Sequence, residues 1–142
     1  MPIKRMEHYL VLSDDIDETK RFYCEVLGMQ EGFRPDLGFP GYWLYVGDTP
    51  CVHIAEWETY KVFTERVGIP ISQRAARTGA LDHIAFNASG FDETVERLEE
   101  LGIEAGKNAL DEIGLRQLFI SDPNGLVIEL NFREGRRAAV SL

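Results

Sequence analysis

The strongest constraint on the fold is a stretch of sequence that occurs twice. Residues 8–22 read HYLVLSDDIDETKRF, and residues 83–98 read HIAFNASGFDETVERL. The same offset of 75 residues separates His8 from His83 and the first Asp-Glu-Thr triplet from the second. Two copies of a unit about half the chain long are too few and too long for a solenoid, so the repeat predicts a duplicated module.

Each copy predicts the element order βαβββ. Alternating or β-branched stretches predict strands, and apolar residues at helical spacing that stop at Gly28 and Gly102 predict one helix in each copy. The predicted strands cover about 6–12, 29–34, 42–46 and 52–56 in the first copy, and 81–87, 104–108, 115–120 and 126–132 in the second.

The predicted fold class is therefore α+β, with two βαβββ modules. We expect a single domain in which modules at about 6–56 and 81–133 are joined by a linker at 57–80. The linker is expected to hold a helix at 58–67 and an irregular segment at 70–79, and residues 135–142 are expected to form a frayed tail.

Composition narrows the class of partner. The net charge of −9 argues against nucleic acid, whose phosphates the summed field would repel. No apolar run is long enough to span a membrane, and the N-terminus lacks the apolar core of a secretory signal, so the cytoplasm is the expected location. Cys24 and Cys51 have no CxxC spacing, which argues against a disulfide framework or a thiolate zinc site.

The three histidines of the chain and one glutamate fall at corresponding strand positions. His8 and His83 lie on the first strand of each copy. On the last strands, alternation turns His53 and Glu129 away from the apolar neighbours that would pack under the helices. These four residues are therefore expected on equivalent faces of the two modules, unless a register slip of one residue turns His53 away.

Their chemistry favours a metal site. A carboxylate on an apolar strand such as LVIELNF costs several kcal/mol to bury unless a cation or strong donors accompany it. Three imidazoles and one carboxylate suit a divalent transition metal such as Fe, Mn, Ni, Co or Zn. We therefore predict that His8, His53, His83 and Glu129 hold one such ion, with a structural polar cluster or a vestigial site as the alternatives.

Two further segments carry a family resemblance. The helical stretch RFYCEVLGM and the closing stretch FISDPNGLVIELNF, together with the repeat, resemble the vicinal-oxygen-chelate superfamily over roughly residues 6–133. This superfamily includes glyoxalases, extradiol dioxygenases, fosfomycin-resistance enzymes, methylmalonyl-CoA epimerase and bleomycin-resistance proteins. The resemblance implies that each sheet curls into a half-barrel around a metal held at the four positions named above, and it implies a homodimer with a small-molecule substrate.

Three functions remain open under this resemblance. The first is a glyoxalase-type lyase or isomerase, in which Glu129 or a neighbouring group moves a proton through an enediolate-like intermediate. Relatives of that type commonly have a glutamate where His53 stands, so only Glu129 offers a carboxylate base here. The second is an Fe(II) extradiol dioxygenase that uses His8, His83 and Glu129 as ligands and His53 in acid-base catalysis. The third is a drug-binding protein without catalysis.

Four residues of the first copy are candidates for substrate binding. Phe33, Tyr42 and Trp43 would suit a ring-shaped substrate, although ordinary core packing is the alternative for at least two of the aromatic residues in this region, which include Phe39. Arg34 would hold an anionic group, with Arg116 and Lys107 as other candidates, and a solvated surface position is the alternative for all three. Leu12 stands where lactoylglutathione lyases commonly have an arginine, which argues against a glutathione adduct.

Overall fold

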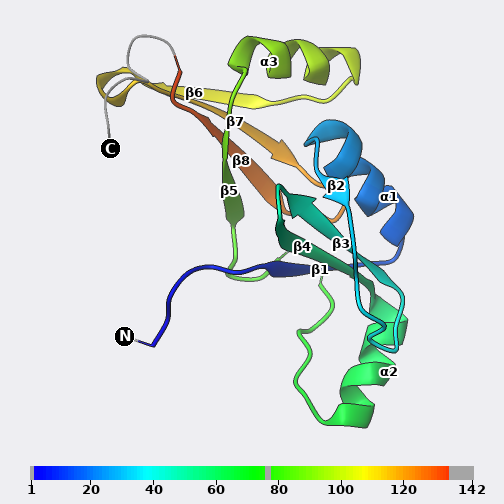
Figure 1. The fold of residues 1–142 in the computed structure, drawn as a ribbon. Helices are drawn as coiled ribbons and strands as arrows, with labels where there is room; N and C mark the ends of the chain where they lie inside the picture. Colours follow the sequence, from blue (N-terminus) through cyan, green and yellow to red (C-terminus); the bar gives the residue numbers. More distant parts are fainter. Residues whose placement is uncertain (1, 76–77, 135–142) are drawn as a thin grey trace. The chain divides into compact units, whose positions relative to one another are not determined.

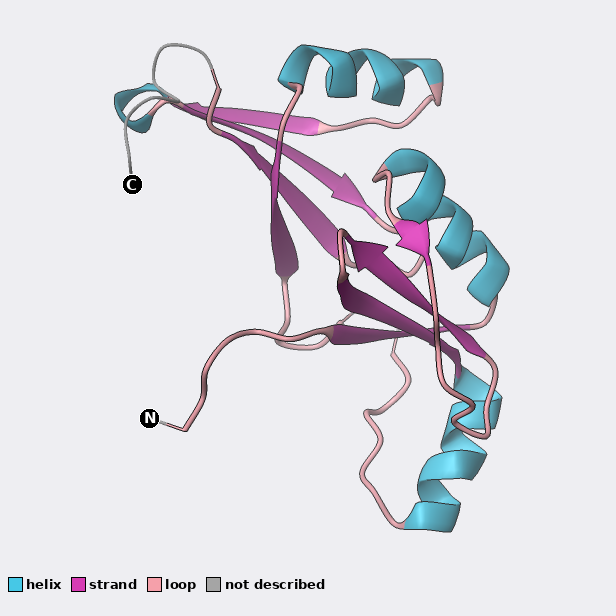
Figure 2. Cartoon of the chain, in the orientation of Figure 1, coloured by secondary structure: helices cyan, strands magenta, loops and turns pink. Residues whose placement is uncertain are grey.

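The computed structural model describes residues 2–75 and 78–134. The chain divides into two compact units, Met1–Arg74 and Ala75–Leu142. Each unit contains one four-stranded sheet, and in each unit a helix follows the first strand (Figure 1, Figure 2). This arrangement confirms the predicted α+β class with two βαβββ modules.

The first unit is built on a sheet with the strand order β1-β4-β3-β2. In it, β1 (Tyr9–Ser13) runs parallel to β4 (Thr49–Glu56), while β3 (Gly41–Val46) runs antiparallel to β4 and to β2 (Gln30–Glu31). Between β1 and β2, α1 (Ile16–Arg21) continues into a π-helical turn at Phe22–Val26. Directly after β4 comes α2 (Trp57–Val67).

The second unit repeats this topology with the strand order β5-β8-β7-β6. Here β5 (His83–Ala88) runs parallel to β8 (Val127–Phe132), and β7 (Leu115–Ser121) runs antiparallel to β8 and to β6 (Gly106–Leu110). The helix α3 (Phe91–Glu100) follows β5, and a short 3-10 turn at Asp111–Ile113 joins β6 to β7.

Local chemistry accounts for where the helices begin and end. The Asp15 side chain accepts a hydrogen bond of 3.0 Å from the backbone N–H of Glu18, which caps the start of α1. Gly28 and Gly102 have φ values of 73° and 70°, in the left-handed region that favours glycine, and each follows a helical segment as predicted. The π-helical turn was not predicted, because a repeat of 3.6 residues carries no sign of one inserted residue.

The apolar core of each unit lies on one face of its sheet. In β4, Val52 and Ile54 are buried, and in β8, Ile128, Leu130 and Phe132 are buried. Phe132 meets Phe91 of α3 edge to face, with ring centroids 5.3 Å apart. The alternate residues of both strands lie on the opposite face of their sheet, where the candidate site residues are found.

Some predicted boundaries shift. The strand predicted at 29–34 is reduced to β2, and the one predicted at 104–108 begins and ends two residues later as β6. The linker helix is confirmed as α2, and the described part of 70–79 contains neither helix nor strand. The predicted tail at 135–142 lies outside the described residues. Within residues 2–75 and 78–134, no helix has the length and apolar character needed to cross a membrane.

Candidate functional site

The strand registers place the last-strand candidates at equivalent points of the two sheets. Leu10 pairs with His53 in the first sheet, and Ala85 pairs with Glu129 in the second. His8 and His83 each stand two residues before those partners, so each lies on the same face as its counterpart. The structure therefore places the four predicted ligands as two separate pairs, one pair in each unit.

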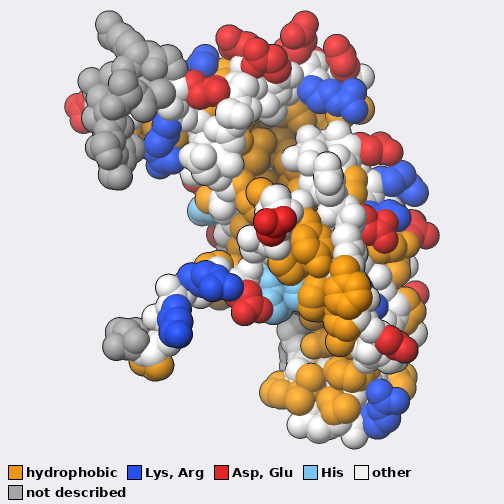
Figure 3. All heavy atoms as spheres, in the orientation of Figure 1, with side chains coloured by type: hydrophobic (Ala, Val, Ile, Leu, Met, Phe, Trp, Pro, Cys, Tyr) orange, Lys and Arg blue, Asp and Glu red, His pale blue; other side chains and the backbone are white. Residues whose placement is uncertain are grey.

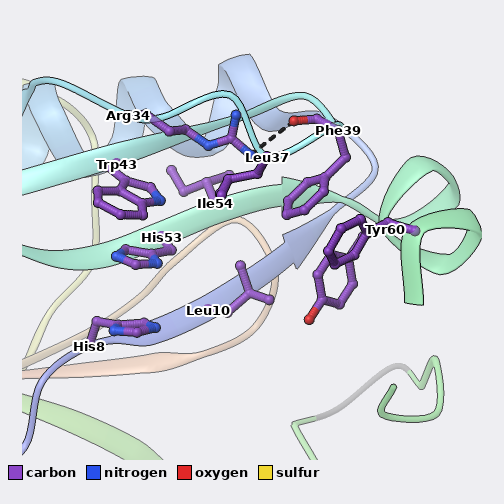
Figure 4. Close-up of a pocket in the computed structure, with 10 residues that line it drawn as sticks. His8, Leu10, Arg34, Leu37, Phe39, Trp43, His53, Ile54 and Tyr60 are labelled. Carbon is purple, nitrogen blue, oxygen red and sulfur yellow. Dashed lines mark hydrogen bonds between the residues drawn. The ribbon is translucent and has the colours of Figure 1, made fainter. Parts of the chain in front are cut away.

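The pair in the first unit is part of a stack of three rings. The rings of His8 and His53 are nearly parallel, with centroids 3.7 Å apart, and the Trp43 ring covers the other side of His53 at 4.2 Å (Figure 4). His53 Nε2 lies 3.0 Å from the carbonyl oxygen of Pro50. Because a carbonyl oxygen only accepts, Nε2 must carry the proton, and Nδ1 is left with the lone pair that a metal requires.

Acidic residues hold the other two histidines through the opposite ring nitrogen. The residue before each histidine contacts its Nδ1: Glu7 contacts His8 at 2.8 Å, and Asp82 contacts His83 at 2.8 Å. A carboxylate on one ring nitrogen is the arrangement that commonly orients a metal-binding histidine, because it leaves Nε2 for the metal. The duplicated acid-histidine pair was visible in the sequence and could have been identified there.

The pair in the second unit is set in a network of amides. Glu129 Oε2 accepts hydrogen bonds from Asn131 at 2.8 Å and from Gln117 at 3.4 Å, while Oε1 lies 3.4 Å from His83 Nε2. Asn108 in turn donates to Gln117 at 2.8 Å. These amides provide the donors that a carboxylate on an apolar strand needs, and strand alternation could have identified Asn131, two residues beyond Glu129.

The donor chemistry of both pairs suits a divalent transition metal. His8 and His53 each have one ring nitrogen engaged and the other available. His83 has Nδ1 engaged by Asp82 and Nε2 facing Oε1 of Glu129, whose other oxygen is held by amides. Among the residues that the structure describes, no cluster of three or more His, Cys, Asp or Glu side chains is arranged to hold a metal ion. Coordination of one ion by all four residues therefore stays a prediction.

A cavity of about 230 Å³ in the first unit contains some of the predicted substrate residues. It is lined by His8, His53, Trp43 and Arg34 and by apolar side chains from β1, β4, α2 and the loop before β3 (Figure 4). The apolar side chains from α2 and that loop, among them Tyr60 and Phe63, were not predicted, although the helical spacing of these two would have placed them on one face.

The structure does not bring the other candidates to this cavity. Tyr42 alternates with Trp43, so it lies on the opposite face, where its hydroxyl donates to Asp17 of α1. Phe33 is 75% exposed and does not line the cavity. In the second unit, Arg116 lies over the Phe91 ring at 4.0 Å and pairs with Asp92, and Lys107 lines a separate hollow beside α3.

The four site residues lie in different electrostatic surroundings, which predicts a measurable difference between two histidines. Burial, and then the positive charge of His8, lower the pKa of His53 to about 4, whereas the hydrogen bond with Asp82, and then the charge of Glu129, raise the pKa of His83. In NMR titrations of metal-free protein, we therefore expect His53 to titrate near pH 4 and His83 above the ordinary value of 6.5.

The two shifts have opposite consequences for stability. An unfolded chain protonates His53 near pH 6.5 and the folded chain only near pH 4, so the contribution of neutral His53 is lost as pH falls through that window. The contribution of protonated His83 is present below pH 6.5 and is lost as pH rises through its raised pKa. An Asp82→Asn variant should return the pKa of His83 toward 6.5, and simultaneous titration of both histidines in the native protein would contradict the prediction.

Comparisons with known proteins agree with the duplicated topology. The family model described as Glyoxalase/Bleomycin resistance protein/Dioxygenase superfamily matches residues 5–130. A relative from Arabidopsis thaliana named Glyoxylase I 4 is 31% identical over 128 residues, which cover 88% of this chain and 68% of that protein.

Solved structures show the same fold at lower identity. A virulence protein from Salmonella typhimurium is 22% identical and superposes with a TM-score of 0.66, covering 94% of this chain and 100% of its own. A lactoylglutathione lyase from Agrobacterium tumefaciens is 19% identical with a TM-score of 0.63, covering 93% of this chain and 96% of its own. At these identities, the two structures establish the fold and leave the activity to be argued from the site.

Proposed function

The chain belongs to the glyoxalase/bleomycin resistance protein/dioxygenase superfamily, and from that premise we propose that it is a metal-dependent lyase or isomerase of the glyoxalase type. Its substrate would be a small molecule with two vicinal oxygens. The observation that carries the proposal is the setting of Glu129: amides hold one carboxylate oxygen, and the other faces His83. A carboxylate held in this way is suited to act as a general base.

The metal would be held by His8 and His53 of the first unit and by His83 and Glu129 of the second. The fit rests on their chemistry, since His8 and His53 each have one nitrogen occupied by a protein group and one available, and His83 Nε2 faces only Glu129, another proposed ligand. When bound, a divalent ion would polarise the two vicinal oxygens of the substrate. Members of the superfamily commonly form dimers, and we propose a homodimer for this chain as well.

The chain's own residues would move the proton. Glu129 Oε1 is the carboxylate oxygen that the amides leave available, so it would take the proton from the carbon next to the substrate carbonyl, giving an enediolate-like intermediate. Returning that proton to the neighbouring atom would complete an isomerisation. Because His53 replaces the glutamate common in glyoxalases, Glu129 would carry out both transfers without a second carboxylate.

A second function is compatible with the surroundings of His53. Its Nε2 is committed to the Pro50 carbonyl and its ring is stacked between His8 and Trp43, which suits a group next to a metal as well as a ligand. With His8, His83 and Glu129 as ligands, the site would then correspond to the two-histidine, one-carboxylate arrangement of Fe(II) dioxygenases. We retain ring-cleaving dioxygenase as the alternative.

Elemental analysis of protein purified without oxygen, followed by assays on four substrate classes, separates these functions. The classes are thiol adducts of 2-oxoaldehydes, acyl-CoA esters with an acidic α-carbon, vicinal diols and catechols. The proposal predicts a divalent metal together with isomerisation or lyase turnover, accompanied by exchange of the substrate α-proton with solvent. Iron as the sole metal, with oxygen uptake on catechols, would replace it by the dioxygenase function.

A further inference from the structure

We propose that the cavity of the first unit binds the carboxylate of a small, mostly apolar organic acid, and that the guanidinium of Arg34 is its binding partner. The inference deepens the proposed function by naming a substrate class, and it rests on that function for the chemistry that follows binding. Its four supports are the size of the cavity, its walls, its charge and the incomplete bonding of Arg34.

The volume and the lining residues of the cavity indicate a small ligand that is mostly apolar. The cavity volume of about 230 Å³ lies below the range of about 300–1,000 Å³ for sites that hold drug-sized ligands, so a small molecule fits best. Six of the described lining residues are aliphatic or aromatic: Leu10, Leu37, Phe39, Ile54, Tyr60 and Phe63. In Figure 4, Leu10, Phe39 and Tyr60 lie beside the ring stack. An apolar ligand in contact with this wall gains binding free energy, because its apolar surface is removed from water.

The same face of the unit presents a broad apolar surface. Figure 3 shows hydrophobic side chains gathered around the pale-blue histidines of this unit. Leu10, one of the lining residues, is 38% exposed although it is aliphatic. Covering such a side chain with an apolar ligand removes apolar area from water, which favours binding.

Charge defines the head group of the ligand. Among the described residues that line the cavity, Arg34 carries the only permanent charge, and none is acidic. This is notable in a chain with a net charge of −9, where acidic residues outnumber lysine and arginine 24 to 15. A cavity with one guanidinium and no carboxylate selects an anion over a cation of the same shape.

The bonding of Arg34 is incomplete within the unit. Its Nη2 donates to the Phe39 carbonyl oxygen at 2.9 Å, and its Nε is buried without a hydrogen-bond partner. Among the described residues it makes no ion pair, although the nearby charge of Asp36 favours its charged form. Burial lowers the pKa of Arg34, so the charge is partly stripped of water and lacks a close counter-ion. A carboxylate matches the forked geometry of a guanidinium and would supply that counter-ion.

The absence of a side chain at Gly41 leaves room for the Arg34 guanidinium. A Cβ atom added at Gly41 would lie 2.9 Å from Nη2 of Arg34 and 2.1 Å from the Ile54 carbonyl oxygen. Glycine at this position therefore lets the guanidinium lie close against β3. The side chain is held by this packing and by the Phe39 carbonyl, so little conformational entropy remains to be lost when an anion binds.

Calorimetry on the full-length, metal-free protein with three probes tests the proposal. Benzoate carries both the anion and an apolar ring, benzamide replaces the charge by a neutral group, and acetate lacks the ring. We expect benzoate to bind at least tenfold more tightly than either other probe, which is the size of one hydrogen bond to a charged group. In Arg34→Gln, the affinity for benzoate should fall to the affinity for benzamide. Arg97→Gln changes an exposed arginine of α3 and should leave the affinity for benzoate unchanged.

Several outcomes would overturn the proposal. These are equal affinity of benzoate and benzamide in the native protein, equal benzoate affinity in Arg34→Gln and the native protein, or no benzoate binding to the metal-free protein. Chemical shifts of the Trp43 indole and Leu10 methyl signals on titration show that Arg34→Gln remains folded and that benzoate enters this cavity. Because the test uses metal-free protein, its result does not depend on the proposed metal site. The metal measurements in turn do not depend on the proposed anion site, so the two proposals can fail separately.

Discussion

Glu129→Gln is expected to lower the affinity of the protein for a divalent metal at least about 100-fold, because loss of even an outer partner of a metal ligand commonly costs 10–100-fold. The glutamine keeps the size of the side chain and its amide oxygen can still accept from Asn131, so the network around it should persist. What it removes is the negative charge that a cation needs. Isothermal titration with Zn²⁺ and Ni²⁺, together with elemental analysis, measures the loss.

His83→Ala should give a loss of the same order, and a surface variant provides the control. Glu99→Gln removes a carboxylate on α3 of the same unit. Because Glu99 is not one of the four proposed ligands, this change should leave metal binding unchanged. Circular dichroism shows whether each variant retains its fold. Full metal occupancy in His83→Ala would rule out the proposed four-residue site, because the ion would then be bound without one of its proposed ligands.

Phe132→Ala is expected to lower the free energy of unfolding by about 3–5 kcal/mol, as for other large-to-small changes at buried aromatic positions. Phe132 is fully buried in β8 and meets Phe91 of α3 edge to face, so alanine leaves a cavity where the helix packs on the sheet. Urea denaturation followed by circular dichroism measures the change.

Phe33→Ala is the matched control for this core substitution. The Phe33 side chain is 75% exposed, so its removal should change the free energy of unfolding by no more than about 0.5 kcal/mol. An equal loss in both variants would contradict the packing described for β8. Phe33→Ala also tests the prediction from sequence that this residue contacts the substrate, since benzoate affinity should be unaffected if the ring lies outside the cavity.

The sequence was sufficient for the fold because the same pattern appears twice. One copy of a histidine, an amphipathic helix and three strands is a weak signal, but two copies at a fixed offset define the module, and alternation in VHI and IEL then sets which face carries His53 and Glu129. The registers of β1 with β4 and of β5 with β8 agree with that assignment. The family comparison confirms the resemblance drawn from the closing stretch.

The surroundings of the site could not be predicted, because they depend on contacts between elements distant in sequence. Gln117 reaches Glu129 across the pairing of β7 with β8, and Tyr60 of α2 reaches the cavity from outside the repeat. Tyr42 and Trp43 looked equivalent as neighbouring aromatic residues, yet alternation along β3 separates them to opposite faces. The π-helical turn likewise leaves no trace in a helical repeat.

The amides around Glu129 have a stereochemical consequence. Asn131 and Gln117 hold Oε2, so Oε1 is the oxygen that would meet a substrate if Glu129 is the base that we propose. A base with a single fixed oxygen approaches a prochiral carbon from one side only. A proton removed and returned by that oxygen would pass along one face of the substrate, so the handedness of the product would be set by two neutral amides that take no part in the proton transfer.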